Sequence, residues 1–243
     1  MGRALAYVAG PGREPPVLSL LAAGSSVTVN LGGNLNKPST SILVLLAVTV
    51  LAVAPSMLIL LTGFTRIVIV FGLTRNALGL GTTPPNQVIA GLALFLSLFI
   101  MAPTLNQMNH VALQPYLHGQ ETATQAYRAA EVPLKTWLLE QTGKDELAMT
   151  TSIDQEHPKT PADTSLAALI PAFLLSQLKS AFTIGFVIFI PFLIIDLVVS
   201  ATLMSMGVVM LPPTLVSLPF KLLLFVLVNG WVLITHSLVV SFH

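Results

Sequence analysis

Long apolar runs dominate the hydrophobic pattern of this sequence. The first covers Ile42–Leu61 and continues, after a short break, through Phe64–Leu73. Val88–Ala102 forms the next run, and Phe182–Met206 and Thr214–Val240 fill the last third of the chain. A helix needs about 20 apolar residues to cross the hydrocarbon core of a bilayer. The pattern therefore predicts an all-α, polytopic membrane protein with four apolar segments.

Turn residues divide these segments into two long helical hairpins. Glycine and proline gather at 79–86, between the first two segments, and at 207–213, between the last two. Pro55 predicts a kink in the first run, because proline removes a helical hydrogen bond. We expect the first hairpin over residues 37–105 and the second over 166–243.

A polar block lies between the hairpins. Residues 121–163 hold four basic and eight acidic side chains, more than half of all the charges in the chain. Apolar residues within 111–147 recur at roughly helical spacing, which indicates amphipathic helices. The sequence therefore predicts a small helical module over 106–165.

Composition supports a membrane location. The chain is 54% apolar and 9% charged, whereas soluble domains carry about 25% charged residues. Lipid or partner subunits must therefore cover its surface. The net charge of +1 gives no indication of nucleic-acid binding. The absence of cysteine excludes disulfides and cysteine-ligated metal.

The N-terminal segment and two arginines bear on orientation. Residues 1–36 contain a short apolar run and are either a signal peptide or an unstructured leader. Arg66 and Arg75 lie between the first two apolar segments, without an acidic residue nearby, so we expect this connection to face the cytoplasm. The 106–165 module would then be extracytoplasmic.

Two opposite charges interrupt the last hairpin. A charge at the bilayer centre costs about 2.5–3.5 kcal/mol on insertion scales, so each needs a partner. Asp196 and Lys221 lie roughly 21 and 16 Å from Met210 along their helices, at 1.5 Å per residue. We expect them to form an ion pair that is either structural or part of a proton relay, and a charge-swapped double variant to recover function. Asn229 is expected to make an interhelical hydrogen bond, a role also open to Arg66 and Arg75.

The sequence carries no convincing catalytic or metal-binding motif. It lacks a P-loop and an H-E-x-x-H pair. Ser176 and Lys179 match the short S-x-x-K pattern without any second supporting motif. His110 and His118 lack acidic ligands at helical spacing. We therefore expect no enzyme activity, no catalytic residue, no metal and no cofactor.

The turn of the last hairpin is unusually rich in methionine. Methionine adapts to irregular surfaces because its side chain is flexible and polarisable, and a ring of such turns would make a deformable hydrophobic constriction. An ordinary turn facing lipid is the alternative. The candidate gating residues are Met204, Met206, Gly207, Val208, Val209, Met210, Pro212 and Pro213.

Several long motifs in this chain are specific enough to indicate a protein family. Over roughly residues 40–241, these motifs are Phe64–Val70, Arg75–Gly79, Thr83–Val88 running into Gly91–Leu96, Gln114–Tyr116, Pro133–Lys135 through Gln141–Thr142, Ile170–Phe173, Ala181–Phe186, Ile190–Val199, Met204–Gly207, Leu211–Pro213 and Ser217–Leu222. Together they resemble the FliP family of flagellar export-gate proteins. The resemblance implies a non-catalytic subunit of the bacterial inner membrane, located in the flagellar basal body. It implies a homo-oligomeric ring, expected to be pentameric, with Q- and R-type partner subunits, through which unfolded flagellar proteins pass.

Three positions depart from the family pattern, and two other functions compete. Val208 and Val209 stand where the family typically has methionine, and Asn229 stands where it often has aspartate. The related injectisome export subunits are one alternative. A stand-alone secondary transporter using Asp196 is another, but it predicts internal repeats, and we see none.

Overall fold

The computed structural model of the protein describes residues 40–154, 158–208 and 210–242. Within these ranges all regular elements are helices, as the sequence predicts. The chain divides into two units, residues 1–52 and 53–243, and the packing described below lies within the second. The predicted leader at 1–36 and Val209 of the candidate gate lie outside the described residues.

The first apolar run bends sharply after its proline. Helix α1 (Thr40–Leu61) includes Pro55, and α2 (Phe64–Ala77) follows it at an angle of 80° to its last turns. The break falls at Thr62-Gly63, where a Cβ on Gly63 would come within 2.6 Å of the Phe242 ring. The sharp bend therefore lies beyond Pro55, and the kink expected at Pro55 stays a prediction.

Helix α3 is longer than its apolar run. It covers Asn86–Met108 and passes through Pro103. A π-helical turn, η1 (Asn109–Leu113), and α4 (Gln114–Leu117) continue it, so the helical stretch crosses the predicted boundary at residue 105. The module then adds α5 (Ala123–Glu140), which begins with a capping box at Thr122.

The remaining described elements build the last hairpin and its support. They are α6 (Lys144–Ile153), the short 3₁₀ turn η2 (Pro161–Asp163), α7 (Leu166–Ser205), α8 (Pro213–Leu227) and α9 (Gly230–Val240). Helix α7 is 40 residues long and contains Pro171 and Pro191. The predicted second arm is two helices, because α8 and α9 are bent by 61° at their junction.

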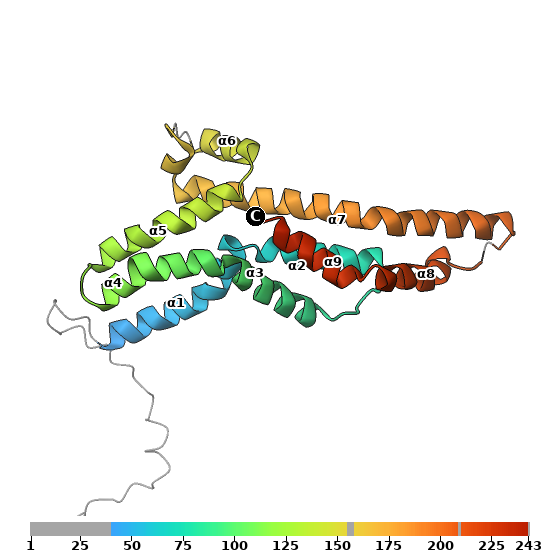
Figure 1. The fold of residues 1–243 in the computed structure, drawn as a ribbon, viewed down its shortest axis with the longest axis horizontal. Coiled ribbons are helices and arrows are strands. Elements are labelled where there is room, and N and C mark those ends of the chain that lie inside the picture. Colours follow the sequence, from blue (N-terminus) through green and yellow to red (C-terminus); the bar gives the residue numbers. More distant parts are fainter. Residues whose placement is uncertain (1–39, 155–157, 209, 243) are drawn as a thin grey trace, which may run out of the picture. The chain divides into compact units, whose positions relative to one another are not determined.

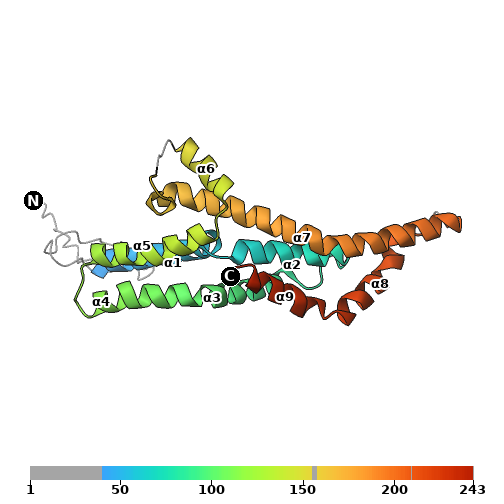
Figure 2. The same cartoon turned by 45° about the horizontal axis from the view of Figure 1, so that its top comes forward.

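Helix α2 lies at the centre of the second unit. In both views it runs alongside α7 (Figures 1 and 2). The approach is close, since a Cβ on Gly185 of α7 would come within 2.2 Å of Leu73. Ile67, Val70 and Phe71 of α2 are fully buried in the core.

The number of helices that could cross a membrane is compatible with the four apolar segments predicted from the sequence. Among the described residues, two helical stretches are long and apolar enough to cross a bilayer, Asn86–Leu117 and Leu166–Ser205. Two bent pairs, Pro55–Leu61 with α2 and α8 with α9, raise the number to four if each pair counts as one span.

Candidate functional site

The α7–α8 turn ends in a well-defined helix-stop motif. The N–H of Gly207 donates to the Met204 carbonyl at 3.1 Å, and the N–H of Val208 donates to the Leu203 carbonyl at 3.0 Å. This is the Schellman arrangement, which needs a residue with positive φ after the helix. Gly207 has φ of 73°. Helix α8 then starts with Pro213 in its first turn, where a missing N–H is harmless.

Large apolar side chains at this turn are exposed. Met204 is 73% exposed, Met206 70% and Met210 96%. Figure 1 shows the turn at the end of the α7–α8 pair, away from α6 and the helices packed around it. We call residues 204–213 the tip. Exposing such apolar side chains to water is energetically unfavourable, so the tip is suited to contact with lipid or with other chains.

Asp196 and Lys221 form the pair that the sequence suggests, within a larger network. The Lys221 Nζ lies 2.6 Å from the Asp196 Oδ2. The Lys221 ammonium also donates to the Ala77 carbonyl at 3.0 Å, and the Ser217 hydroxyl donates to the Asp196 Oδ1 at 2.6 Å. The Lys221 side chain is 6% exposed and that of Asp196 26%.

Two members of this network were missed from the sequence. Ser217 lies four residues before Lys221, so both belong to one face of α8, and this spacing was a usable signal. Ala77 is the last residue of α2, and its carbonyl offers partial negative charge at a helix C-terminus. Nothing in the local sequence reports that contact. The network ties α7, α8 and α2 together near the middle of the hairpin.

Arg66 is a buried helix residue rather than a loop charge. Its guanidinium donates to the Gln177 Oε1 at 2.8 Å, to the Ser241 carbonyl at 3.1 Å and to the Gln141 Oε1 at 3.4 Å. It also lies 4.0 Å from the centre of the Phe242 ring. The side chain thus clamps the C-terminal residues against α2, α5 and α7. Arg66 is therefore not one of the loop charges on which the predicted membrane orientation depends. Of the two arginines, only Arg75 supports that orientation.

Arg75 holds a loop in place. Its guanidinium donates to the Pro84 carbonyl at 3.1 Å and to the Asn86 side chain at 2.7 Å, so it joins the end of α2 to the start of α3. Asn229 differs from expectation. It adopts a left-handed conformation between α8 and α9, its side chain is exposed, and it makes no side-chain hydrogen bond within the described residues. It permits the bend between these helices.

A surface ion pair attaches the module to α7. The Lys179 ammonium lies 2.7 Å from the Glu146 Oε1. This hydrogen bond holds the pKa of the Glu146 carboxyl below its ordinary value. Ser176 donates to the Ala172 carbonyl and accepts from the Gly143 N–H. These contacts give Ser176 and Lys179 structural roles.

The fold and these contacts define a class of protein. The residues described contain no group of three or more side chains suited to hold a metal ion. The features that stand out are long apolar helices, two buried polar networks that fix their register, and an exposed apolar tip. Together they define a helical membrane protein with an exposed apolar tip.

Comparison with known proteins agrees with this class and makes it specific. Residues 47–238 match the model of the FliP family. The flagellar biosynthetic protein FliP of Bacillus subtilis is 51% identical over 205 residues, covering 84% of this chain and 93% of its own. The FliP protein of Caulobacter vibrioides is 47% identical over 221 residues, covering 90% and 83%. The chain therefore belongs to the FliP family.

Family membership confirms the resemblance found in the sequence motifs. It makes the chain a membrane component of flagellar biosynthesis and of the associated protein-export apparatus.

Proposed function

We propose that this chain is a structural and gating subunit of the flagellar type III export gate. Several copies, with Q- and R-type partner subunits, would surround one conduit for unfolded flagellar proteins. The tips of the α7–α8 hairpins would meet at its narrowest point and form a hydrophobic constriction that excludes water and ions. The location proposed is the bacterial inner membrane at the flagellar basal body.

The observation that carries this proposal is the exposed apolar tip on a firmly anchored arm. Met210 is 96% exposed, yet the arm below it is fixed by the Asp196–Lys221 network. A flexible thioether seal on a fixed support can open and reclose while the hairpin keeps its position. Val208 makes the turn stiffer than a methionine would, so the seal relies on Met204, Met206 and Met210.

Orientation remains part of the proposal. Arg75 lies at the α2–α3 connection without a neighbouring acidic residue, which favours the cytoplasmic side for this connection. The acidic module around α5 and α6 would then be extracytoplasmic.

Gly207 offers a direct test of gating. We expect Gly207→Val to abolish swimming motility or to raise ion leak, because a β-branched residue at φ of 73° is strained by about 1–3 kcal/mol and shifts the tip. We expect Gly207→Asn to preserve motility, since asparagine tolerates this conformation. Apart from its chain neighbours, nothing in this chain lies within 4 Å of a Cβ placed on Gly207, so the comparison of valine with asparagine reports backbone strain.

Gly91→Val is the matched control. Gly91 lies within α3, and a Cβ there also meets nothing within 4 Å. The control is expected to retain motility. If Gly207→Val changes neither motility nor ion leak, the tip has no gating role.

A further inference from the structure

The tip carries the most accessible sulfur atoms of the described residues. Met204 is 73% exposed, Met206 70% and Met210 96%, whereas Met101 in the core is 3% exposed. The chain contains no cysteine, so methionines are its only sulfur-containing side chains. An oxidant that attacks sulfur therefore meets its most exposed targets at the tip.

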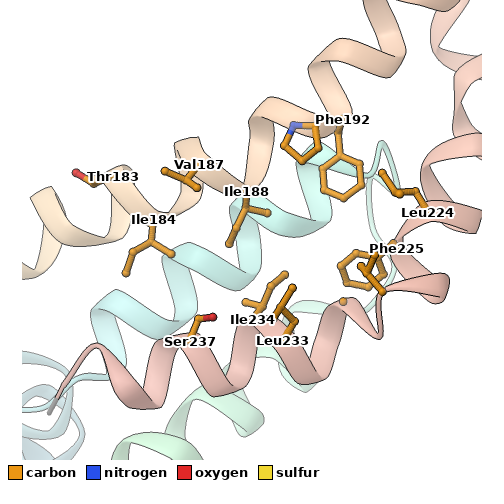
Figure 3. A pocket seen from close by; sticks show the side chains of 13 residues that line it. Thr183, Ile184, Val187, Ile188, Phe192, Leu224, Phe225, Leu233, Ile234 and Ser237 are labelled. Carbon is orange, nitrogen blue, oxygen red and sulfur yellow. The ribbon is translucent and has the colours of Figure 1, made fainter.

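The helices that support the tip offer no such target. Figure 3 shows side chains of α7, among them Ile188 and Phe192, facing side chains of α8 and α9 across an apolar groove. No methionine lines this groove, and residues 166–203 and 213–240 contain none. Oxidation of methionine would therefore change the tip and leave the arms of the hairpin as they are.

Each exposed thioether at the tip can react with hydrogen peroxide. The sulfur gives an electron pair to one peroxide oxygen, and the O–O bond breaks as an S–O bond forms. The sulfur is thereby oxidised to a sulfoxide, while the peroxide is reduced and its second oxygen leaves as water with both protons. The product is a polar side chain, which sulfoxide reductases convert back to methionine.

A sulfoxide oxygen at the tip would find few free donors in its own turn. The N–H groups of residues 206–208 already donate to carbonyls at the end of α7. The Ser205 hydroxyl donates to the Thr202 carbonyl at 2.8 Å. Pro212 and Pro213 have no N–H to offer. The oxygen would therefore take its hydrogen bonds from water, because a dry polar group without a partner is unfavourable.

We propose that the tip is a methionine-oxidation site through which peroxides open the closed constriction, an inference that rests on the gating function proposed above. A hydrophobic constriction closes by excluding water, so sulfoxide oxygens that need hydration weaken the closed state. Residues 208 and 209 are valines, which this reaction leaves unchanged. Met204, Met206 and Met210 therefore carry the response.

Peptide mass spectrometry tests the site itself, independently of gating. The full-length chain, purified with its co-expressed Q- and R-type subunits, is treated briefly with dilute hydrogen peroxide. We expect Met210 to be oxidised about tenfold faster than Met101, because oxidation follows exposure. Equal rates at the two positions, or a Met210 that stays unoxidised, would overturn the proposal.

Ion leak of the same complex in vesicles tests the consequence of oxidation. Peroxide is expected to raise the leak of the natural complex several-fold. Met204→Leu/Met206→Leu/Met210→Leu keeps apolar side chains of similar size without sulfur, so its leak is expected not to respond to peroxide. Met57→Leu/Met149→Leu is the matched control, since these methionines are 54% and 45% exposed but belong to α1 and α6. This control should respond as the natural chain does.

Gly207→Val separates a failure of the oxidation response from a failure of gating, because it shifts the tip without any oxidant. An unchanged leak of the natural complex after peroxide would overturn the oxidation response, and the Gly207→Val result decides separately whether the tip gates. Peroxide sensitivity that survives the three tip substitutions would also overturn it, because the leak would then arise elsewhere.

Discussion

Asp196→Leu is expected to destabilise the protein by about 3 kcal/mol, because removing one partner of a buried pair leaves an unpaired charge. Lys221 would keep only the Ala77 carbonyl, and its side chain is 6% exposed. Lys221→Met is expected to cost less, about 1–2 kcal/mol, since Asp196 keeps the Ser217 hydroxyl and is partly exposed. Unfolding of the purified protein in detergent measures both.

The double variant Asp196→Leu/Lys221→Met tests whether the two side chains stabilise the protein as a pair or independently of each other. Replacing both charges by apolar groups is often near neutral, so the double variant should be more stable than Asp196→Leu alone. Additive losses would contradict coupling between the two side chains. A charge swap is expected to recover only part of the stability. It would place a carboxylate at position 221 against the Ala77 carbonyl, a contact that the sequence did not reveal.

Arg66→Met is expected to cost about 3 kcal/mol, because each buried acceptor left without a donor costs about 1–3 kcal/mol. The Gln177 and Gln141 amide oxygens and the Ser241 carbonyl would lose their shared donor. Arg66→Lys should recover little, since an ammonium cannot reproduce the forked geometry of a guanidinium. Thermal unfolding gives the cost, and hydrogen exchange at 238–242 reports release of the C-terminal residues.

Arg75→Met provides the control for Arg66. Both residues lie on α2, but Arg75 is only half-buried and contacts a loop. Its loss is expected to cost about 1 kcal/mol and to leave exchange at 238–242 unchanged. Equal effects of the two substitutions would mean that Arg66 does not clamp the C-terminus.

Hydrophobic pattern was enough to predict the helical class and the turn at the tip. Runs of apolar residues report membrane helices directly, and Gly207 and Pro213 mark where one helix stops and the next starts. Pairing of Asp196 with Lys221 was also foreseeable, because two isolated charges on the arms of one hairpin have few other partners. The family resemblance depends on long sequence motifs and does not follow from the hydrophobic pattern or the charges.

Other features depend on contacts between distant segments. Arg66 interrupts an apolar run, so it resembled a loop charge, and its three partners lie 75 to 175 residues away. Pro55 lies within an apolar run, and α1 continues through it. The bends occur instead at Gly63 and Asn229, where the chain must fit Phe242 and Phe225. Tertiary packing therefore determines both the burial of Arg66 and the positions of these bends.

Cysteine crosslinking at the tip tests most directly whether several copies meet there. The natural chain has no cysteine, so Met210→Cys introduces a single thiol. Oxidation of the complex purified with co-expressed Q- and R-type subunits is predicted to yield crosslinked dimers of this chain. Ile153→Cys, on the exposed face of α6, serves as the control and should give far fewer. The account would be contradicted if the Met210→Cys chain formed no crosslinked dimers in the oxidised complex and its thiol reacted freely with a lipid-soluble maleimide.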